Sequence, residues 1–348
     1  MRISSIFFNS SCLSGFPDFG GCVDCTAEQL FAAGAGIPRT GDAKPPNQGQ
    51  FGLALRYLWD LEPYLTTELG LYYIRYHAKT PTLGFDGLVF PAGVVGPDAL
   101  FAPSQFFRDY AERVNVFGFS FSTEIFDANV SGEISYRPDE VLGINAREQA
   151  IIEWGSTASP FGRPTRSGGF VTEKKIQAQL SMIQTFGPST RWGIGPLVET
   201  IGADNISLTT EFALVNYPDI PDQCSAGSPE FNRAVLAGGG CIPLVANGGG
   251  SIDATSYGYQ MLMQIEYTNP FDVPITLTPS VAWAHAIHGN SAIGGPFLEE
   301  QMAVTVGLEL DYLETWGAQV IYGSFFGAGD KNDLHDRDFF SFSVSYAF

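Results

Sequence analysis

The chain has 348 residues, of which 16% are charged, 14% are aromatic and 40 are glycine. Its 37 acidic and 18 basic residues give a formal charge of -19, which argues against nucleic acid as a partner. No stretch of the sequence approaches the roughly 18 uninterrupted apolar residues that a membrane-spanning helix needs. If the protein spans a membrane, it must do so as a closed β-barrel, because lipid offers no water to unpaired backbone groups.

The N-terminal residues Met1–Phe8 contain an apolar run that is too short for a signal peptide. Residues 2–8 are instead a candidate strand, followed by a long loop over 9–49. An outer-membrane protein needs a signal peptide. We therefore expect either that the mature sequence begins here or that the chain is the C-terminal part of a longer one.

Apolar and polar side chains alternate with a period of two in about eleven segments, which predicts strands with two different faces. The predicted strands are residues 50–58, 66–77, 114–126, 128–137, 174–186, 204–217, 256–268, 275–286, 301–313, 316–326 and 338–348. A strand at 2–8 would raise the number to about twelve, and single-chain bacterial barrels close with even numbers of strands.

The connections between these strands alternate between short turns and long loops. The long outer loops are predicted at 9–49, 78–113, 138–173 and 218–255. Within the third of them, residues 140–154 have a helix-like apolar spacing. Short turns at one rim and long loops at the other are typical of an all-β, transmembrane, up-and-down antiparallel β-barrel, so we expect residues 1–348 to form a single domain.

The last strand carries the strongest single pattern. Phe340, Phe342 and Val344 lie on one face with Tyr346 and Phe348, and the serines between them lie on the other. This predicts a lipid-facing side and a lumen-facing side, and a C-terminal strand for the barrel-assembly machinery to bind. In a soluble protein, a second sheet would have to cover the apolar face.

Acidic residues on the strands are expected to face inward, because a charge inside hydrocarbon costs several kcal/mol. The predicted lumen-facing acids are Glu68, Glu124, Glu133, Glu211, Glu266, Glu309 and Asp311. As a functional feature they would form an electrostatic filter that lowers anion passage. As a structural feature they would pair with Arg56, with Arg137, or with basic groups on a plug or on further strands.

Aromatic residues gather near the short turns, as an interfacial girdle requires. They are Trp59, Tyr267, Tyr312, Trp316, Tyr346 and Phe348. Of the cysteines, Cys224 and Cys241 bracket a loop of suitable length for a disulfide, which predicts an oxidising compartment. The sequence leaves the pairing of Cys12, Cys22 and Cys25 open.

The sequence contains no recognisable catalytic, cofactor or metal motif. Four histidines, His77, His285, His288 and His335, lie on the loop side without a Gly-x-Ser-x-Gly elbow. The acidic segment 330–338 lacks the turn glycine and spaced glutamate of a calcium loop. We therefore expect no enzyme activity, no cofactor and no metal. A barrel hydrolase that uses Ser and His on adjacent strands is a minor alternative.

Several segments together resemble the large proteobacterial outer-membrane barrels that are catalogued as a domain of unknown function. They are residues 51–57, 68–73 with Tyr76 and His77, 132–138, 279–283 and 336–348. Members of that family are longer, so the resemblance implies that this chain is a C-terminal portion. It also implies a plan similar to porins and long-chain fatty acid channels, and it supplies no catalytic residues.

The expected function is passive passage of small hydrophobic or amphipathic molecules through the bacterial outer membrane. The expected partners are outer-membrane lipid, the solute and the assembly machinery. A surface receptor or adhesin that binds partners through long, disulfide-tied loops is the alternative.

Overall fold

A computed structural model describes residues 39–61, 65–86, 105–125, 128–143, 166–220, 252–292 and 294–347. Several sequence predictions lie outside these residues, namely the strand at 2–8, most of the loop 9–49, all five cysteines and Phe348. In the described part, none of the helices is long and apolar enough to cross a membrane.

An 11-stranded antiparallel sheet dominates the fold, in which each strand pairs with the next strand of the sheet along the chain. Its strands are β1 (Phe51–Leu61), β2 (Leu65–Tyr76), β5 (Val114–Ile125), β6 (Ala128–Gly143), β8 (Phe170–Phe186), β9 (Asn205–Asn216), β10 (Thr255–Thr268), β11 (Ile275–His288), β12 (Met302–Tyr312), β13 (Trp316–Phe326) and β14 (Phe339–Tyr346). Every strand predicted from residue 50 onward is present, which confirms the all-β, up-and-down antiparallel architecture.

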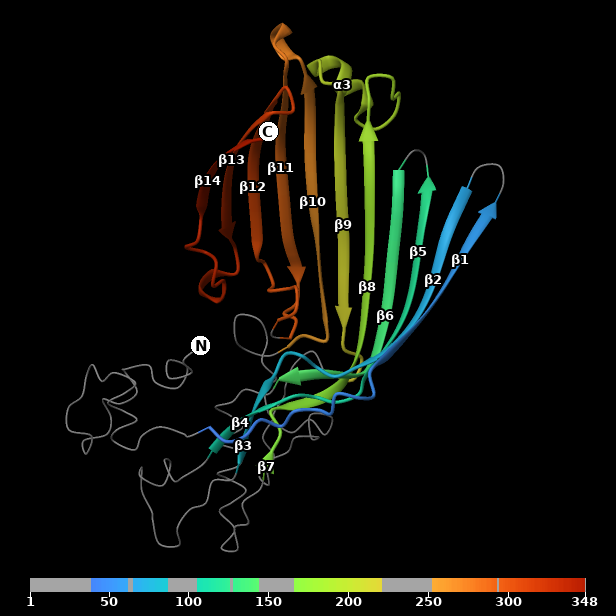
Figure 1. The fold of residues 1–348 in the computed structure, drawn as a ribbon, viewed down its shortest axis with the longest axis vertical. Helices are drawn as coiled ribbons and strands as arrows, with labels where there is room; N and C mark the ends of the chain where they lie inside the picture. Colours follow the sequence, from blue (N-terminus) through green and yellow to red (C-terminus); the bar gives the residue numbers. More distant parts are fainter. Residues whose placement is uncertain are drawn as a thin grey trace, which may run out of the picture.

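The two rims of the sheet differ in the length of their connections. Figure 1 shows the end of β1 and start of β2, and the end of β5 and start of β6, at the same rim as α3 (Gly195–Ile201) and the C-terminus. The backbone N–H of Ala347 donates to the carbonyl of Thr315 in the β12–β13 turn, which fixes the C-terminus at this short-turn rim. The opposite end is the long-loop rim, where a small sheet with strand order β4-β3-β7 lies (Figure 1).

Within the described residues, β1 and β14 are the edge strands and no pairing joins them. Both run toward the short-turn rim, because β1 ends at the β1–β2 hairpin and β14 ends beside Thr315. Two edges that run in the same direction cannot pair with each other as antiparallel strands. An antiparallel closure would therefore need an odd number of further strands between them.

The long-loop rim contains more structure than the sequence predicted. The loop 78–113 holds β3 (Thr82–Asp86) and β4 (Gln105–Asp109), and β3 also pairs with β7 (Arg166–Ser167). The predicted loop 138–173 is too long, because β6 continues to Gly143 and β8 begins at Phe170. Pro138 has no N–H to donate, and the ladder resumes beyond a bulge between Arg137 and Glu140. Residues 140–143 of the predicted helix are therefore strand, and its remainder lies outside the described residues.

The short helix α3 in the β8–β9 connection was not predicted. It begins at Gly195 with Pro196 in its first turn and ends at Ile201, and the capping residue Gly202 has a φ of 67°, which suits a residue without a side chain. Val198, fully buried, packs with Phe186, Ala203 and Ile206. The helix thereby covers one end of the sheet at the short-turn rim.

The register separates the side chains into two faces. On the apolar face, the cross-strand row Leu55, Leu71 and Phe119 continues with Ile134. This face stays open over much of the sheet, with Leu55 66%, Leu180 49% and Phe342 63% exposed. The opposite face, here called the polar face, carries glycine, alanine, serine, threonine, glutamine and glutamate at most of its positions.

A second core lies on the polar face at the long-loop rim. It consists of Leu142, Val215, Tyr217, Ile220, Ile252, Ala286, Ala292 and Phe297. Burial raises the pKa of the Tyr217 hydroxyl far above its ordinary value, so this group stays neutral at physiological pH. The segments that follow β9 and β11 thus fold back over the polar face.

Candidate functional site

The register places all of the predicted lumen-facing acids on the polar face. Glu68 lies opposite Ser122, Glu133 opposite Ser120, and Glu211 opposite Gln260. Glu124 faces Asn129 and Glu266 faces Asn205. On β12, Glu309 faces Gln319, and Asp311 faces Gly317. Their common face follows from the strand period of two together with the register that the hairpins set.

One of these acids has a basic partner within 4 Å in the described part of the chain, and that is Glu68, at 3.7 Å from Arg56. Both side chains are exposed, so the pair is weak. Arg137 does not neutralise any of the predicted acids and instead lies 3.2 Å from Glu140, which also accepts a 3.0 Å bond from Lys175. The polar face therefore keeps a strongly negative character.

Two of the remaining acids have local structural contacts. Glu266 accepts a 3.1 Å hydrogen bond from the Asn205 amide, and Asp311 accepts a 2.9 Å bond from the backbone N–H of Glu314 in the β12–β13 turn. Both contacts are with neutral donors, so both carboxylates still contribute their charge to the polar face.

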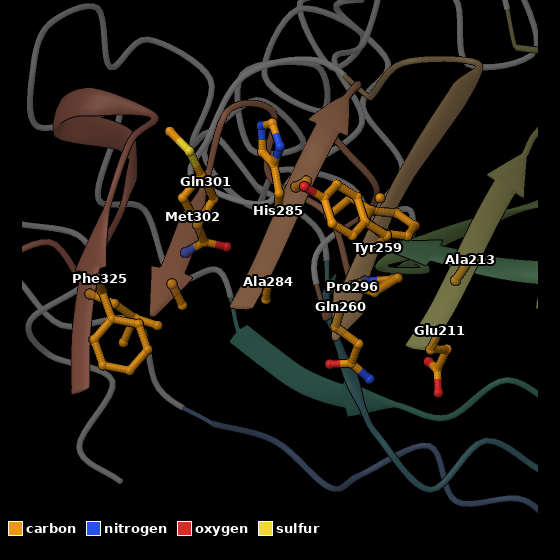
Figure 2. Close-up of a pocket in the computed structure, with 15 residues that line it drawn as sticks. Glu211, Ala213, Tyr259, Gln260, Ala284, His285, Pro296, Gln301, Met302 and Phe325 are labelled. Carbon is orange, nitrogen blue, oxygen red and sulfur yellow. The ribbon is translucent and has the colours of Figure 1, made fainter. Parts of the chain in front are cut away.

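A hollow of about 250 Å³ lies on the polar face of β9 to β13, close to the long-loop rim; it is named the upper hollow here. Its floor is made of small residues, among them Ala213, Gly258, Ala284 and Ala303. Pro296, Phe297, Phe325 and Leu334 supply apolar surface, and Glu211, Gln260 and Gln301 supply polar groups. Figure 2 shows Glu211 and Gln260 pointing to one side of the sheet and His285 pointing to the other.

A second hollow of about 110 Å³, the lower hollow, lies on the same face toward the short-turn rim. Its polar lining includes Gln264, Glu309 and Gln319. The paired residues Ala284 and Ala303 line the upper hollow, and Ala282 and Thr305, one position further on the same face, line the lower one. Small side chains therefore connect two hollows that each hold one carboxylate and two amides.

The histidines show no catalytic arrangement with serine in the part of the chain that the structure describes. His77 is buried, and its ring nitrogens bond the carbonyl of Gln48 and the N–H of Arg113. His288 pairs with Glu299 at 2.9 Å, and His335 bonds the carbonyl of Asn332. His285 is on the apolar face, beside the rings of Tyr259 and Trp283. Among the described residues, no group of three or more His, Cys, Asp or Glu side chains could hold a metal ion.

The predicted girdle residues that the structure describes share the apolar face at the short-turn rim. Tyr312, Trp316 and Tyr346 form one cross-strand row, in which the rings of Trp316 and Tyr346 are 4.6 Å apart. Trp59 and Tyr267 lie near the corresponding ends of β1 and β10.

Sequence reasoning missed the residues that roof the upper hollow. Pro296, Phe297 and Leu334 lie in the connections 289–301 and 327–338, which carry no strand period. The sequence did contain one indication of this roof. Phe297 and Leu298 are large apolar residues within a Gly- and Pro-rich connection, and a loop exposed to solvent along its whole length would rarely carry them.

The model of one protein family, described as a protein of unknown function (DUF1302), matches residues 7–348. This confirms the predicted relation to a family of unknown function. No curated protein and no solved structure matches the chain.

Proposed function

The chain belongs to the DUF1302 family, and from this premise and its two-faced sheet we propose that it forms the wall of a passive channel in the bacterial outer membrane. Its solutes are small hydrophobic or amphipathic molecules. The observation that carries the proposal is the separation of side chains along the 11-stranded sheet, with mostly apolar groups on one face and mostly carboxylates, amides and small residues on the other.

The exposed apolar face supports the membrane location. A soluble monomer rarely exposes contiguous apolar patches larger than a few hundred Å². Here large side chains are more than one third exposed from Leu55 on β1, through Leu180 on β8, to Phe342 on β14. Lipid contact removes the cost of that exposure, and the Trp and Tyr residues at the short-turn rim suit the headgroup region.

The polar face supports passage of solutes. Two adjacent hollows with small, uncharged floors lie along it, and each offers a carboxylate and two amides. Lining of this kind tolerates neutral or cationic solutes and disfavours anions. In this proposal β14, with its apolar row Phe340, Phe342 and Val344, is also the segment that the barrel-assembly machinery recognises.

The test is solute flux through vesicles that contain the folded full chain. We expect liposomes with the protein to swell in small neutral solutes, while protein-free liposomes do not. Ala282→Trp fills the lower hollow and should lower the rate severalfold. Val281 is the neighbouring residue, lies on the apolar face and is 40% exposed, so Val281→Trp should leave the swelling rate unchanged. Folded protein without any flux would contradict the channel proposal.

A further inference from the structure

The volume and the lining of the upper hollow suit a binding site for a small molecule as well as a passage for solutes. Its volume of about 250 Å³ exceeds the roughly 150 Å³ apolar cavity that accepts a single benzene ring. A Cβ at position 258 would lie 2.5 Å from the His285 carbonyl oxygen on β11 and 3.0 Å from a ring carbon of Phe297, so glycine at this position gives room to both the paired strand and the roof. A ligand with one ring and a short arm fits this space.

The roof is held in place by hydrogen bonds, so the hollow is formed before any ligand enters. The hydroxyl of the fully buried Ser291 donates to the Phe297 carbonyl at 3.0 Å and accepts from the Phe297 N–H at 2.9 Å. The Gln301 amide donates at 2.8 Å to Asn332, which is also fully buried. A preformed site loses less free energy in ordering itself around a ligand.

The charge in the hollow is negative, because Glu211 is the one acidic residue among its described lining residues. Glu211 has no basic group within 4 Å in the described part of the chain, and it lies directly across the ladder from Gln260. None of the described lining residues is lysine or arginine. One carboxylate with two amides and an apolar roof offers too few oxygens for a hard divalent cation. It does suit a cationic group attached to an apolar body.

We propose that the upper hollow binds small aryl-alkyl ammonium ions, with the ammonium against Glu211 and Gln260 and the ring under Phe297. The biological role of this binding rests on the proposed function, because the inference names the class of solute that binds inside the channel. The binding itself does not require flux. An ammonium–carboxylate contact is a charge-assisted hydrogen bond, which is roughly twice as strong as a neutral one.

The experiment compares three probes of one shape and different charge, namely 2-phenylethylammonium, 2-phenylethanol and phenylacetate. Equilibrium dialysis measures their binding to the full chain folded in nanodiscs, with empty nanodiscs subtracted. We expect the ammonium to bind about tenfold more tightly than the alcohol, which corresponds to about 1.4 kcal/mol. Phenylacetate should bind most weakly, because it meets a like charge.

Glu211→Gln should bring the ammonium down to the affinity of the alcohol, and Glu211→Asp should give an intermediate value. Ala284→Leu fills the floor and should weaken the ammonium and the alcohol alike. The control Glu314→Gln removes an exposed carboxylate in the β12–β13 turn and should change none of the affinities. Folding of each variant is checked by circular dichroism, and Ala284→Leu gives a second test if Glu211→Gln does not fold.

Equal affinities of the three probes in the natural protein would overturn the inference, as would an ammonium advantage that survives Glu211→Gln. The two proposals fail separately. If solutes cross the vesicles but the three probes bind equally well, the ammonium site is contradicted and the channel proposal stands. If the ammonium binds preferentially but no solute crosses, the site stands and the channel proposal is contradicted.

Discussion

Asp338 joins the start of β14 to β13 through three hydrogen bonds. Its carboxylate accepts from the Phe325 N–H at 3.0 Å, from the Ser324 hydroxyl at 2.9 Å and from the Tyr322 hydroxyl at 3.1 Å. These donors, led by the Phe325 N–H, lower the pKa of Asp338 below its ordinary value. A lowered pKa in the folded state means that the contribution to stability exists above the unfolded-state pKa of about 3.9 and disappears as pH falls through the folded value.

Replacing this residue should therefore change the acid response of the protein. We expect Asp338→Asn to be less stable than the natural chain at pH 7, with the difference shrinking as the pH falls below about 4. Urea unfolding of the micelle-bound protein, followed by tryptophan fluorescence at several pH values, measures this difference. A difference in unfolding free energy that stays the same down to low pH would show that the charge of the Asp338 carboxylate does not cause the stabilisation.

Glu309 and Asp311 test the filter at the lower end of the polar face. Neither has a basic partner in the described part of the chain, so in the proposed channel both charges would act on passing ions. We expect Glu309→Gln with Asp311→Asn to lower the cation-to-anion permeability ratio at least about twofold in 0.1 M salt, where screening extends over roughly 10 Å. Reversal potentials in planar bilayers under a salt gradient measure the ratio. Because Asp311 also holds the turn, the single variant Glu309→Gln is compared with Glu314→Gln, and equal ratios would discard the filter.

Helix α3 shows how an element stabilises the short-turn rim. Val198 is fully buried against strand residues that include Phe186 and Ile206, whereas Glu199 is exposed. Removing two methyl groups from a buried site leaves a cavity. We expect Val198→Ala to lower the free energy of unfolding by about 2 kcal/mol, and Glu199→Ala to change it by less than about 0.5 kcal/mol. Equal effects of the two variants in urea unfolding would mean that α3 does not pack on the sheet as described.

The strands could be predicted from the sequence, because each has about ten residues of alternating side chains and turn residues at its ends. The register then follows from the hairpins, which is why Glu211 and Glu309 could be assigned to one face in advance. The ends of β6 and β8 were misjudged, because Pro138 marks a bulge that the strand passes through and not its end.

The missed elements are those that depend on distant contacts. The strands β3, β4 and β7 have five, five and two residues, too few for a period to stand out, and they pair across the long-loop rim. The same holds for the upper hollow. Its floor lies on predicted strands, but Phe297 and Leu334 reach it from connections whose path the local sequence does not determine.

At the scale of the whole molecule, the sheet has two unlike surfaces and two edges that run in the same direction. The apolar surface needs lipid or another apolar layer, and the edges β1 and β14 need an odd number of further strands for an antiparallel closure. The segment 2–8, predicted as a strand from its sequence, is the candidate within this chain.

The two-faced wall can be tested residue by residue along β12. In a variant without the 5 native cysteines, single cysteines at positions 304 to 309 carry an environment-sensitive fluorophore in folded, vesicle-bound protein. We predict that labels at Val304, Val306 and Leu308 are quenched by nitroxide-bearing lipid, and that labels at Thr305, Gly307 and Glu309 are quenched by a water-soluble quencher. The same quenching at all six positions, without a period of two, would contradict a wall between lipid and an aqueous passage.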